Sequence, residues 1–238
     1  MAPSARTVAV IDLNADLGEG VTDDHGLLEV VTSANVACGY HAGDEVTMRN
    51  VCEGAVRRGV SVGAQVSYAD RENFGRVRMD VDFGELRDQV ADQVSLLTRA
   101  ALIAGATVAY VKPHGALYNR VVDDEHQARA VLAGSGDLPV LGLPGSVFVR
   151  LASEAGRAQH LEGFPDRAYT AEGTLVPRTE EGAVISDADQ IAGRAVEMAR
   201  SGRVASVCVH GDSPGAVANA HAVRRALEAA GFSLRSFT

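Results

Sequence analysis

The chain has 238 residues, of which 46% are apolar, and its 22 basic against 31 acidic residues give a formal net charge of −9 at pH 7. The apolar side chains suffice for a sizeable core, and no run of basic residues marks a surface for nucleic acid, so we expect no such partner. The first apolar run, 8–13, is far shorter than the roughly 20 residues of a membrane span. We therefore expect a cytoplasmic protein without membrane contact.

Short apolar runs recur along the chain and predict seven β-strands, over residues 8–13, 33–37, 61–64, 107–111, 139–143, 160–164 and 204–209. Helical patterns lie between most of them, over residues 44–58, 83–104, 123–133, 146–155, 187–200 and 214–230. The last helix is expected to have Ser213 as its N-terminal cap and Pro214 at its first position.

Strands that are apolar along their length and alternate with helices are typical of a parallel sheet covered on both faces. No linker or change of composition divides the chain, so we predict one domain over residues 1–238. An open sheet and a closed barrel both fit this order. The turn NADLGEG lacks the G-x-G-x-x-G spacing of open dinucleotide-binding sheets, and we therefore favour a seven-stranded parallel β/α barrel.

Polar residues follow six of the seven predicted strands, and several are two positions apart, which makes their side chains point the same way. Ligands of parallel α/β proteins bind at the carboxyl ends of the strands, so we expect one polar cavity there. The residues that follow the strands are Asp12, Asn14, Asp16, Glu19, Asn35, His41, Asp44, Gln65, Tyr68, Lys112, His114, Asn119, Glu162, Asp166, Arg167, His210 and Asp212.

Two connections, 67–82 and 166–187, are longer than the usual roughly 2–6 residues and leave the same face. Arg76, Arg167 and Arg178 in them are candidates for binding a carboxylate or phosphate, although salt bridges to neighbouring acidic residues would explain them equally well.

Three histidines, His41, His114 and His210, follow strands, and we interpret them together as site residues. Lys112 at a strand end needs an anion beside it, either a ligand or a carboxylate such as Glu162 or an aspartate of the first strand. Asp44 opens a helix, so capping is an equal alternative. No H-E-x-x-H or phosphate-loop motif is present, and we expect no tightly bound metal, although Asp12 could meet His41 and His114 in space.

Five motifs in order, DLNADLGEG, SANVACGYHAGD, VKPHGALYN, FPDRAY followed by GTLVPR, and VCVHGDSPGA, resemble the LamB/YcsF family over almost the whole chain. The characterised members of that family are the A subunits of the prokaryotic ATP-dependent 5-oxoprolinase. The resemblance implies a distorted TIM-like barrel of the glycoside hydrolase/deacetylase type. It also implies hydrolysis of the 5-oxoproline lactam to L-glutamate coupled to hydrolysis of ATP, bound with Mg²⁺, and partner subunits B and C.

By the same resemblance, the catalytic residues are expected to be Asp12, Asp16, His41, Lys112, His114 and His210. The expected substrate-binding residues are Asn14, Glu19, Asn35, Asp44, Gln65, Tyr68, Arg76, Asn119, Arg167, Arg178 and Asp212. The chain departs from the family pattern at Gln65, where a histidine is usual, at Val66 and at Val77. Two other functions stay open: a metal-dependent deacetylase or amidohydrolase that works without ATP, and a non-catalytic binding or scaffold subunit.

Overall fold

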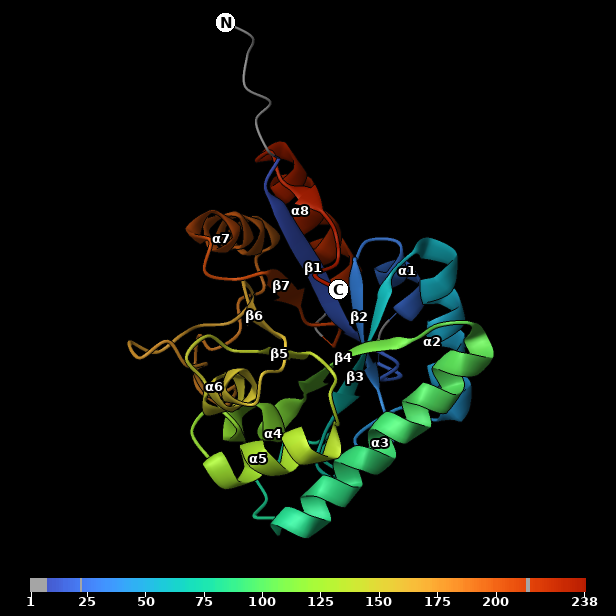
Figure 1. Ribbon diagram of the computed structural model, residues 1–238. Helices are drawn as coiled ribbons and strands as arrows, with labels where there is room; N and C mark the ends of the chain where they lie inside the picture. Colours follow the sequence, from blue (N-terminus) through green and yellow to red (C-terminus); the bar gives the residue numbers. More distant parts are fainter. Residues whose placement is uncertain (1–7, 22, 213–214) are drawn as a thin grey trace, which may run out of the picture.

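The strands of the computed structural model, which describes residues 8–21, 23–212 and 215–238, form a closed parallel barrel with helices outside it (Figure 1). Each barrel strand pairs with the next in chain order, and β1 closes the ring by pairing with both β2 and β7. The strands are β1 Val10–Leu17, β2 Ser33–Ala37, β3 Ser61–Val66, β4 Val108–Pro113, β5 Val140–Gly142, β6 Gln159–Gly163 and β7 Ser206–Val209. The predicted seven-stranded barrel is thus confirmed.

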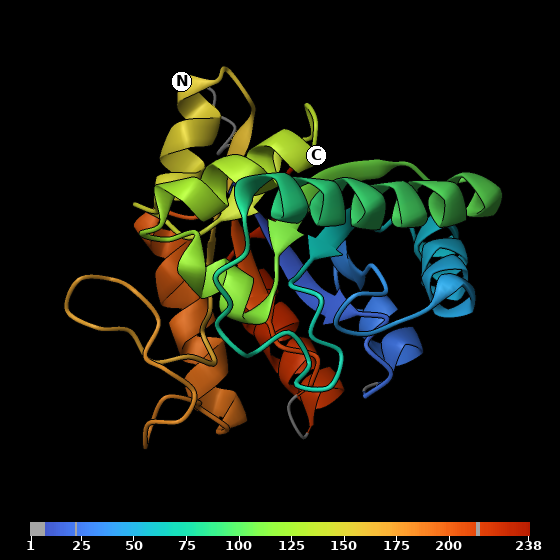
Figure 2. The ribbon, with the colours of Figure 1, turned by 90° about the horizontal axis from the view of Figure 1, so that it is seen from below.

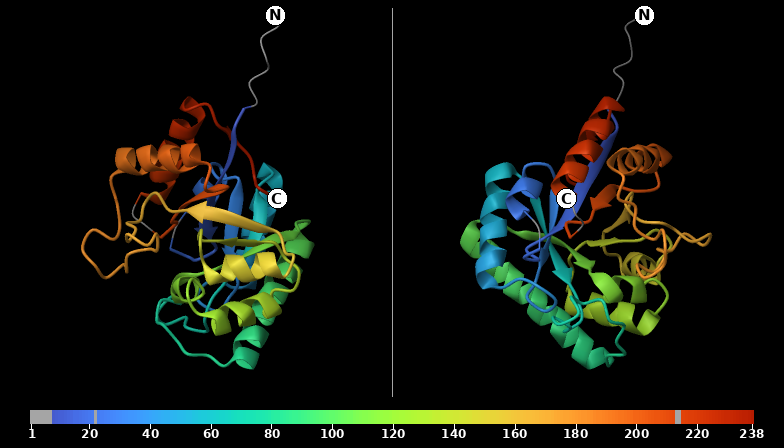
Figure 3. Two further views of the ribbon diagram at one scale, coloured as in Figure 1. Left: turned by 60° about the vertical axis from the view of Figure 1, so that its left-hand side comes forward. Right: turned by 180° about the vertical axis from the view of Figure 1, so that it is seen from behind.

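The helices surround the strands on the outside, as the two views in Figure 3 show. They are α1 Asp24–Leu28, α2 Glu45–Arg58, α3 Phe83–Ala104, α4 Gly115–Arg120, α5 Glu125–Gly134, α6 Val147–Glu154, α7 Ala188–Ser201 and α8 Ala216–Ala229. The predicted cap of α8, Ser213 with Pro214, lies outside the described residues. No helix among the described residues has the length and apolarity needed to cross a membrane.

The helix boundaries follow from local chemistry. Asp44 accepts a hydrogen bond from the backbone N–H of Thr47 and so begins α2, and Gly59 ends that helix with a left-handed φ of 66°. Asp187 begins α7 in the same way by accepting from the N–H of Gln190. These caps agree with the predicted helix starts.

The first strand is longer than the sequence pattern predicted, because its inward face is polar. β1 continues to Leu17, so Asp12, Asn14 and Asp16 belong to the strand and lie at three depths inside the barrel. The alternate residues Leu13, Ala15 and Leu17 belong to the apolar core outside the strands. The main hydrophobic core is therefore the layer between barrel and helices.

The C-terminal segment covers the amino end of the barrel. The short strand β8, Ser233–Leu234, pairs with Val10 and Ile11 at the start of β1. Beyond it, the ring of Phe237 packs against two rings, with its centre 4.9 Å from the ring centre of Tyr110 and 4.4 Å from that of His160. Figure 2 shows the C-terminus on one side of the molecule and the two long connections, 67–82 and 166–187, on the opposite side. Access to the barrel interior is thus at the carboxyl ends of the strands.

Candidate active site

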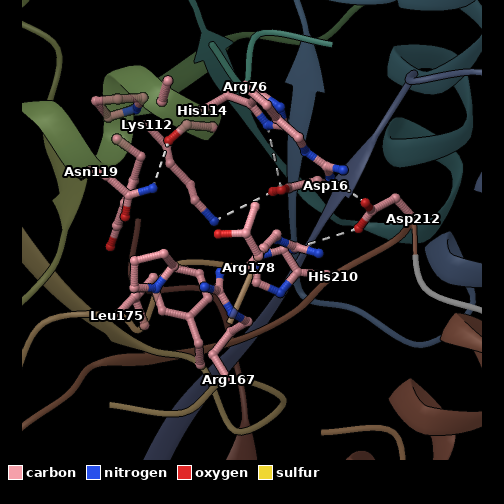
Figure 4. Close-up of a pocket in the computed structure, with 17 residues that line it drawn as sticks. Asp16, Arg76, Lys112, His114, Asn119, Arg167, Leu175, Arg178, His210 and Asp212 are labelled. Carbon is pink, nitrogen blue, oxygen red and sulfur yellow. Dashed lines mark hydrogen bonds and ion pairs between the residues drawn. The ribbon is translucent and has the colours of Figure 1, made fainter. Parts of the chain in front are cut away.

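A cavity of about 400 Å³ lies at the carboxyl ends of the strands, between the barrel and the two long connections (Figure 4). Charged and polar residues line it together with several rings and aliphatic side chains. The residues that line it include Asp16, Arg76, Lys112, His114, Tyr118, Asn119, Phe164, Arg167, Leu175, Arg178, His210 and Asp212. The predicted convergence of strand ends on one polar cavity is therefore present for this group.

Lys112 is the buried cation of the cavity floor. Its Nζ lies 2.9 Å from Glu162 Oε2, 3.4 Å from Asp16 Oδ1 and 3.2 Å from Cys208 Sγ. Burial is the largest single influence and acts to lower the pKa of this amine, but its neighbours Asp16, Cys208 and Glu162 together outweigh it and hold the pKa well above its usual range. The ammonium also lies 5.2 Å from the centre of the Phe164 ring. Lys112 is a fixed positive charge beside any ligand in the cavity.

Asp16 carries the matching negative charge. Burial acts to raise the pKa of its carboxyl, but Lys112, and after it His210 and His114, lower the pKa below its usual range. Asn35 Nδ2 donates to Oδ1 at 2.9 Å and fixes the carboxylate. An ionised carboxylate at the cavity surface can accept a proton or orient a water molecule.

His210 and Asp166 form a hydrogen-bonded pair. The His210 Nδ1 lies 2.8 Å from Asp166 Oδ2, and the same oxygen accepts from the His210 backbone N–H at 3.1 Å. Burial acts to raise the pKa of Asp166, but the His210 ring lowers it below its usual range. A carboxylate on Nδ1 selects the tautomer that carries its proton there and leaves Nε2 as the lone-pair nitrogen. His210 therefore has the arrangement of a general base.

His41 and His114 stack in parallel beside the cavity, with ring centres 4.0 Å apart and an angle of 13° between the rings. Burial lowers the pKa of His41 to about 4, and burial followed by the His41 charge lowers the pKa of His114 well below its usual range. Both rings are thus neutral at pH 7. Glu19 Oε1 lies 3.6 Å from His41 Nε2 and 3.4 Å from His114 Nδ1, and these three residues could hold a metal ion.

Arginines from both long connections line the cavity. Arg76 and Arg178 both form ion pairs with Asp212, and the Arg178 guanidinium nitrogen lies 3.8 Å from Asp212 Oδ1 (Figure 4). Arg167 instead donates to the backbone oxygens of Val176, at 2.6 Å, and Ala183, at 3.3 Å, and so shapes the 166–187 connection. Because Arg76 and Arg178 share one carboxylate, the cavity has positive charge left over for an anionic ligand.

Comparison with known proteins gives this cavity a context. Residues 11–238 match the model of the LamB/YcsF family. The chain belongs to the LamB/YcsF family. A relative from Streptomyces avermitilis, named as the A subunit of 5-oxoprolinase, is 55% identical, covering 96% of this chain and 100% of the relative. A relative of the same name from Mycolicibacterium gilvum is 51% identical, covering 96% of this chain and 99% of its own.

Solved structures agree with the assignment. A lactam utilization protein from Thermus thermophilus is 36% identical and superposes with a TM-score of 0.89, covering 96% of this chain and 100% of the other. The catalytic domain of a peptidoglycan N-acetylglucosamine deacetylase from Eubacterium rectale shares 13% identity with a TM-score of 0.57, covering 99% of this chain and 94% of that domain. The second likeness concerns the fold alone, and it confirms the predicted deacetylase type of barrel.

Several residues predicted for the LamB/YcsF site do not line the wall of this cavity. Asp12 lies at the opposite end of the barrel interior, where it accepts hydrogen bonds from Thr32, Ser33 and Ser206, so its catalytic role stays a prediction that this cavity does not support. Asn14 donates to Ser206 at 2.6 Å below Lys112.

Three predicted substrate-binding residues also have other partners. Asn35 connects Asn14 to Asp16 inside the barrel, and Asp44 caps α2. The Tyr68 hydroxyl donates to Gln127 Oε1 at 2.9 Å in the helix layer. Their partners explain each of them as structural residues.

The remaining members of the predicted set surround or line the cavity. Gln65 Nε2 contacts Glu19 Oε1 at 3.0 Å and His114 Nδ1 at 2.9 Å. Asn119 lines the cavity with its amide directed to the Gly115 carbonyl oxygen at 3.2 Å.

Glu162, Asp166, Tyr118 and Phe164 belong to the site or its support although the prediction did not select them. Of these, the sequence pattern indicated Asp166 only as a residue that follows a strand, and Glu162 also as a possible carboxylate partner of Lys112. Tyr118 lies on α4, a helix that the sequence analysis did not predict, one turn after His114. A helix start directly after His114 would have been the signal for Tyr118.

The carboxyl of Asp12 makes stability dependent on pH. Burial raises its pKa to about 6, against the effect of the serine and threonine donors. An acid with a raised folded-state pKa is ionised first in the unfolded chain, so its contribution to stability falls as pH rises from about 4 to 6. Asp12→Asn removes this titration. We expect the free energy of unfolding of the variant minus that of the wild type to be about 2–3 kcal/mol larger at pH 7 than at pH 4.

Urea unfolding of both proteins at pH 4, 5, 6 and 7 measures this effect, with the exposed Asp88→Asn as control. A stability difference between wild type and Asp12→Asn that stays constant over these pH values would contradict the expectation.

Proposed function

We propose that this chain is the A subunit of an ATP-dependent 5-oxoprolinase, and that its cavity holds the lactam during hydrolysis to L-glutamate. The names of relatives at 51–55% identity over nearly the whole chain support this proposal. The observation that carries it is the juxtaposition, in one cavity, of the Lys112 ammonium, the Asp16 carboxylate and the Asp166-supported His210.

The ligand fits the charges of the cavity. 5-Oxoproline is a small anion with one carboxylate and a neutral lactam ring. Arg178 and Arg76 offer guanidinium groups for the carboxylate, since they share Asp212 between them. Phe164 and Tyr118, whose ring centres are 5.4 Å apart, offer an apolar wall for the ring carbons. With the substrate bound in this way, the lactam carbonyl would lie toward the cavity floor and Lys112.

Hydrolysis requires three changes: a bond forms between a water oxygen and the carbonyl carbon, the C–N bond is cleaved, and the ring nitrogen gains a proton. Lys112 stabilises the negative charge that develops on the carbonyl oxygen. His210 Nε2 takes the proton from water and returns one to the leaving nitrogen, while Asp166 holds the ring. Asp16 orients the water. ATP, when bound, would supply the driving force by phosphorylating the carbonyl oxygen with release of ADP, and the negative charge beside Lys112 would then be that of the phosphate. One water would open the ring to an acyl phosphate and a second would hydrolyse it, so the net reaction consumes ATP and two waters and releases glutamate, ADP and phosphate.

The word subunit in the relatives' names supports a multi-subunit enzyme, and we propose that subunits B and C are needed for turnover in the cytoplasm, where ATP is available. The test measures glutamate and phosphate release from 5-oxoproline by this chain alone, by the partners alone and by all three. We expect equal amounts of both products only with all three present. Turnover by the partners without this chain would contradict the proposal, and persistent inactivity with retained 5-oxoproline binding would identify a binding subunit.

A second candidate is amide hydrolysis without ATP, which the Glu19, His41 and His114 cluster favours because such a set can hold a hydrolytic metal ion. The same assay separates the two functions when ATP is omitted. Release of glutamate without ATP would favour this second function over the first.

A further inference from the structure

The cluster formed by Glu19, His41 and His114 has the spacing of metal ligands. The Glu19 Oε1 lies 3.4 Å from His114 Nδ1 and 3.6 Å from His41 Nε2. Two donors bound at about 2.0–2.1 Å to one tetrahedral ion are about 3.3–3.5 Å apart. The two Glu19 distances are thus close to the edge length of such a tetrahedron, and all three ligand atoms lie within 4.8 Å of one another.

His41 has the unmet bonding capacity that a ligand needs. The residue is 1% exposed, and neither ring nitrogen has a hydrogen-bond partner among the residues that the structure describes. A buried polar atom without a partner costs about 1–3 kcal/mol, so such atoms in a folded protein call for an ion or a water.

His114 is held with its other nitrogen occupied. Its Nε2 lies 3.2 Å from the backbone oxygen of Phe74, and donation to this oxygen leaves the lone pair on Nδ1, which faces Glu19. Phe74 has a left-handed φ of 59°, a strained conformation for a residue with a side chain. A backbone carbonyl that fixes a histidine tautomer is typical of the surroundings of metal sites.

The fourth position is next to Gln65. Its Nε2 lies between Glu19 Oε1 and His114 Nδ1, and its Oε1 is buried without a partner among the described residues. Rotation of the amide by half a turn exchanges these two atoms and brings an oxygen to the ligand side. Gln65 therefore satisfies the two ligand atoms when no metal is bound and can provide a ligand when one is.

We propose that Glu19, His41 and His114 bind one divalent transition-metal ion, with Zn²⁺ the best match, beside the substrate cavity. Two imidazoles and one carboxylate favour this class over Mg²⁺ or Ca²⁺, which prefer all-oxygen sites. The site departs from the sequence-based expectation of no tightly bound metal. It is a binding property of this chain, independent of whether the lactam reaction depends on ATP.

The test is calorimetric titration of the chelator-treated full chain with ZnCl₂, repeated with Co²⁺ and read by its ligand-field absorption. We expect one ion per chain and tetrahedral Co²⁺ bands. Glu19→Gln and His41→Ala are expected to weaken binding at least about 100-fold. His221→Ala, an exposed histidine on α8, is the matched control and is expected to leave binding unchanged.

Circular dichroism first establishes that each variant is folded. If His41→Ala is unfolded, Glu19→Gln decides, because it keeps the shape of the side chain. Absence of stoichiometric binding to the wild type, or equal affinity of the wild type and folded Glu19→Gln, would overturn the proposal. Since binding is measured without substrate, this result is distinct from a failure of the lactam assay.

Discussion

Replacing Lys112 by methionine is expected to lower the free energy of unfolding by about 3–5 kcal/mol and to reduce kcat for 5-oxoproline by at least about 10²–10³-fold. The two effects have different causes. Without the ammonium, the buried carboxylates of Asp16 and Glu162 lose the cation at 3.4 and 2.9 Å from them. Without the same charge, the oxyanion of the lactam carbonyl loses its stabilisation.

A double variant separates these effects. Lys112→Met combined with Glu162→Gln removes both members of the closer ion pair, and replacing a whole buried pair by neutral residues is often nearly neutral for stability. We expect the double variant to recover most of the lost unfolding free energy while its kcat stays low. Urea unfolding and the reconstituted glutamate-release assay measure the two quantities on the same samples.

The control for this experiment is Arg99→Met on the exposed face of α3, which is expected to change neither quantity. If the double variant regained stability and activity together, Lys112 would be a structural residue and the proposed oxyanion role would be refuted. If Lys112→Met were as stable as the wild type, the buried ion pair would not be the reason for its position.

The prediction from sequence succeeded where the signal for an element and its ends is local. β2 at Ser33–Ala37 and α3 at Phe83–Ala104 have the predicted boundaries, and Asp44 and Asp187 cap the helices they were expected to begin. Each of these signals is local, because it depends on residues within a few positions of one another.

Prediction from apolar runs failed for the strand whose inward face is polar. The prediction ended the first strand at Leu13, because Asn14 and Asp16 interrupt the apolar run, whereas in the barrel these residues face inward and their neighbours face the helices. The alternation itself was visible in the sequence, but which face is buried against helices depends on closure of the sheet. The short elements α1, α4 and β8 have too few residues to produce a periodic signal.

Which carboxylate meets which cation also depends on closure. Sequence analysis required an anion beside Lys112 and named Glu162 or a first-strand aspartate, and the barrel supplies both Glu162 and Asp16. The prediction treated Asp12 and Asp16 alike, since it assigned both to the end of the first strand. Their separation along β1 places Asp16 at the cavity and Asp12 in the serine and threonine network at the other end.

Asp166→Asn is expected to lower kcat by about 10²–10⁴-fold with little change in KM. In the wild type, Asp166 accepts from both the Nδ1 and the backbone N–H of His210. In the variant, the asparagine oxygen can accept from the backbone N–H, which turns the amide N–H₂ toward Nδ1. The imidazole must then carry its proton on Nε2, and that nitrogen can no longer accept a proton from water.

Two measurements together test this positioning role. Steady-state kinetics of the reconstituted enzyme give the separate effects on kcat and KM, and ¹⁵N NMR of the labelled ring reports which His210 nitrogen carries the proton. A purely structural loss would not move the tautomer in a folded variant. Asp88→Asn, an exposed substitution of the same kind on α3, is the control. Activity within twofold of the wild type, or an unchanged His210 tautomer with reduced kcat, would contradict the role proposed for Asp166, because the argument requires that the proton on Nδ1 be placed by this carboxylate.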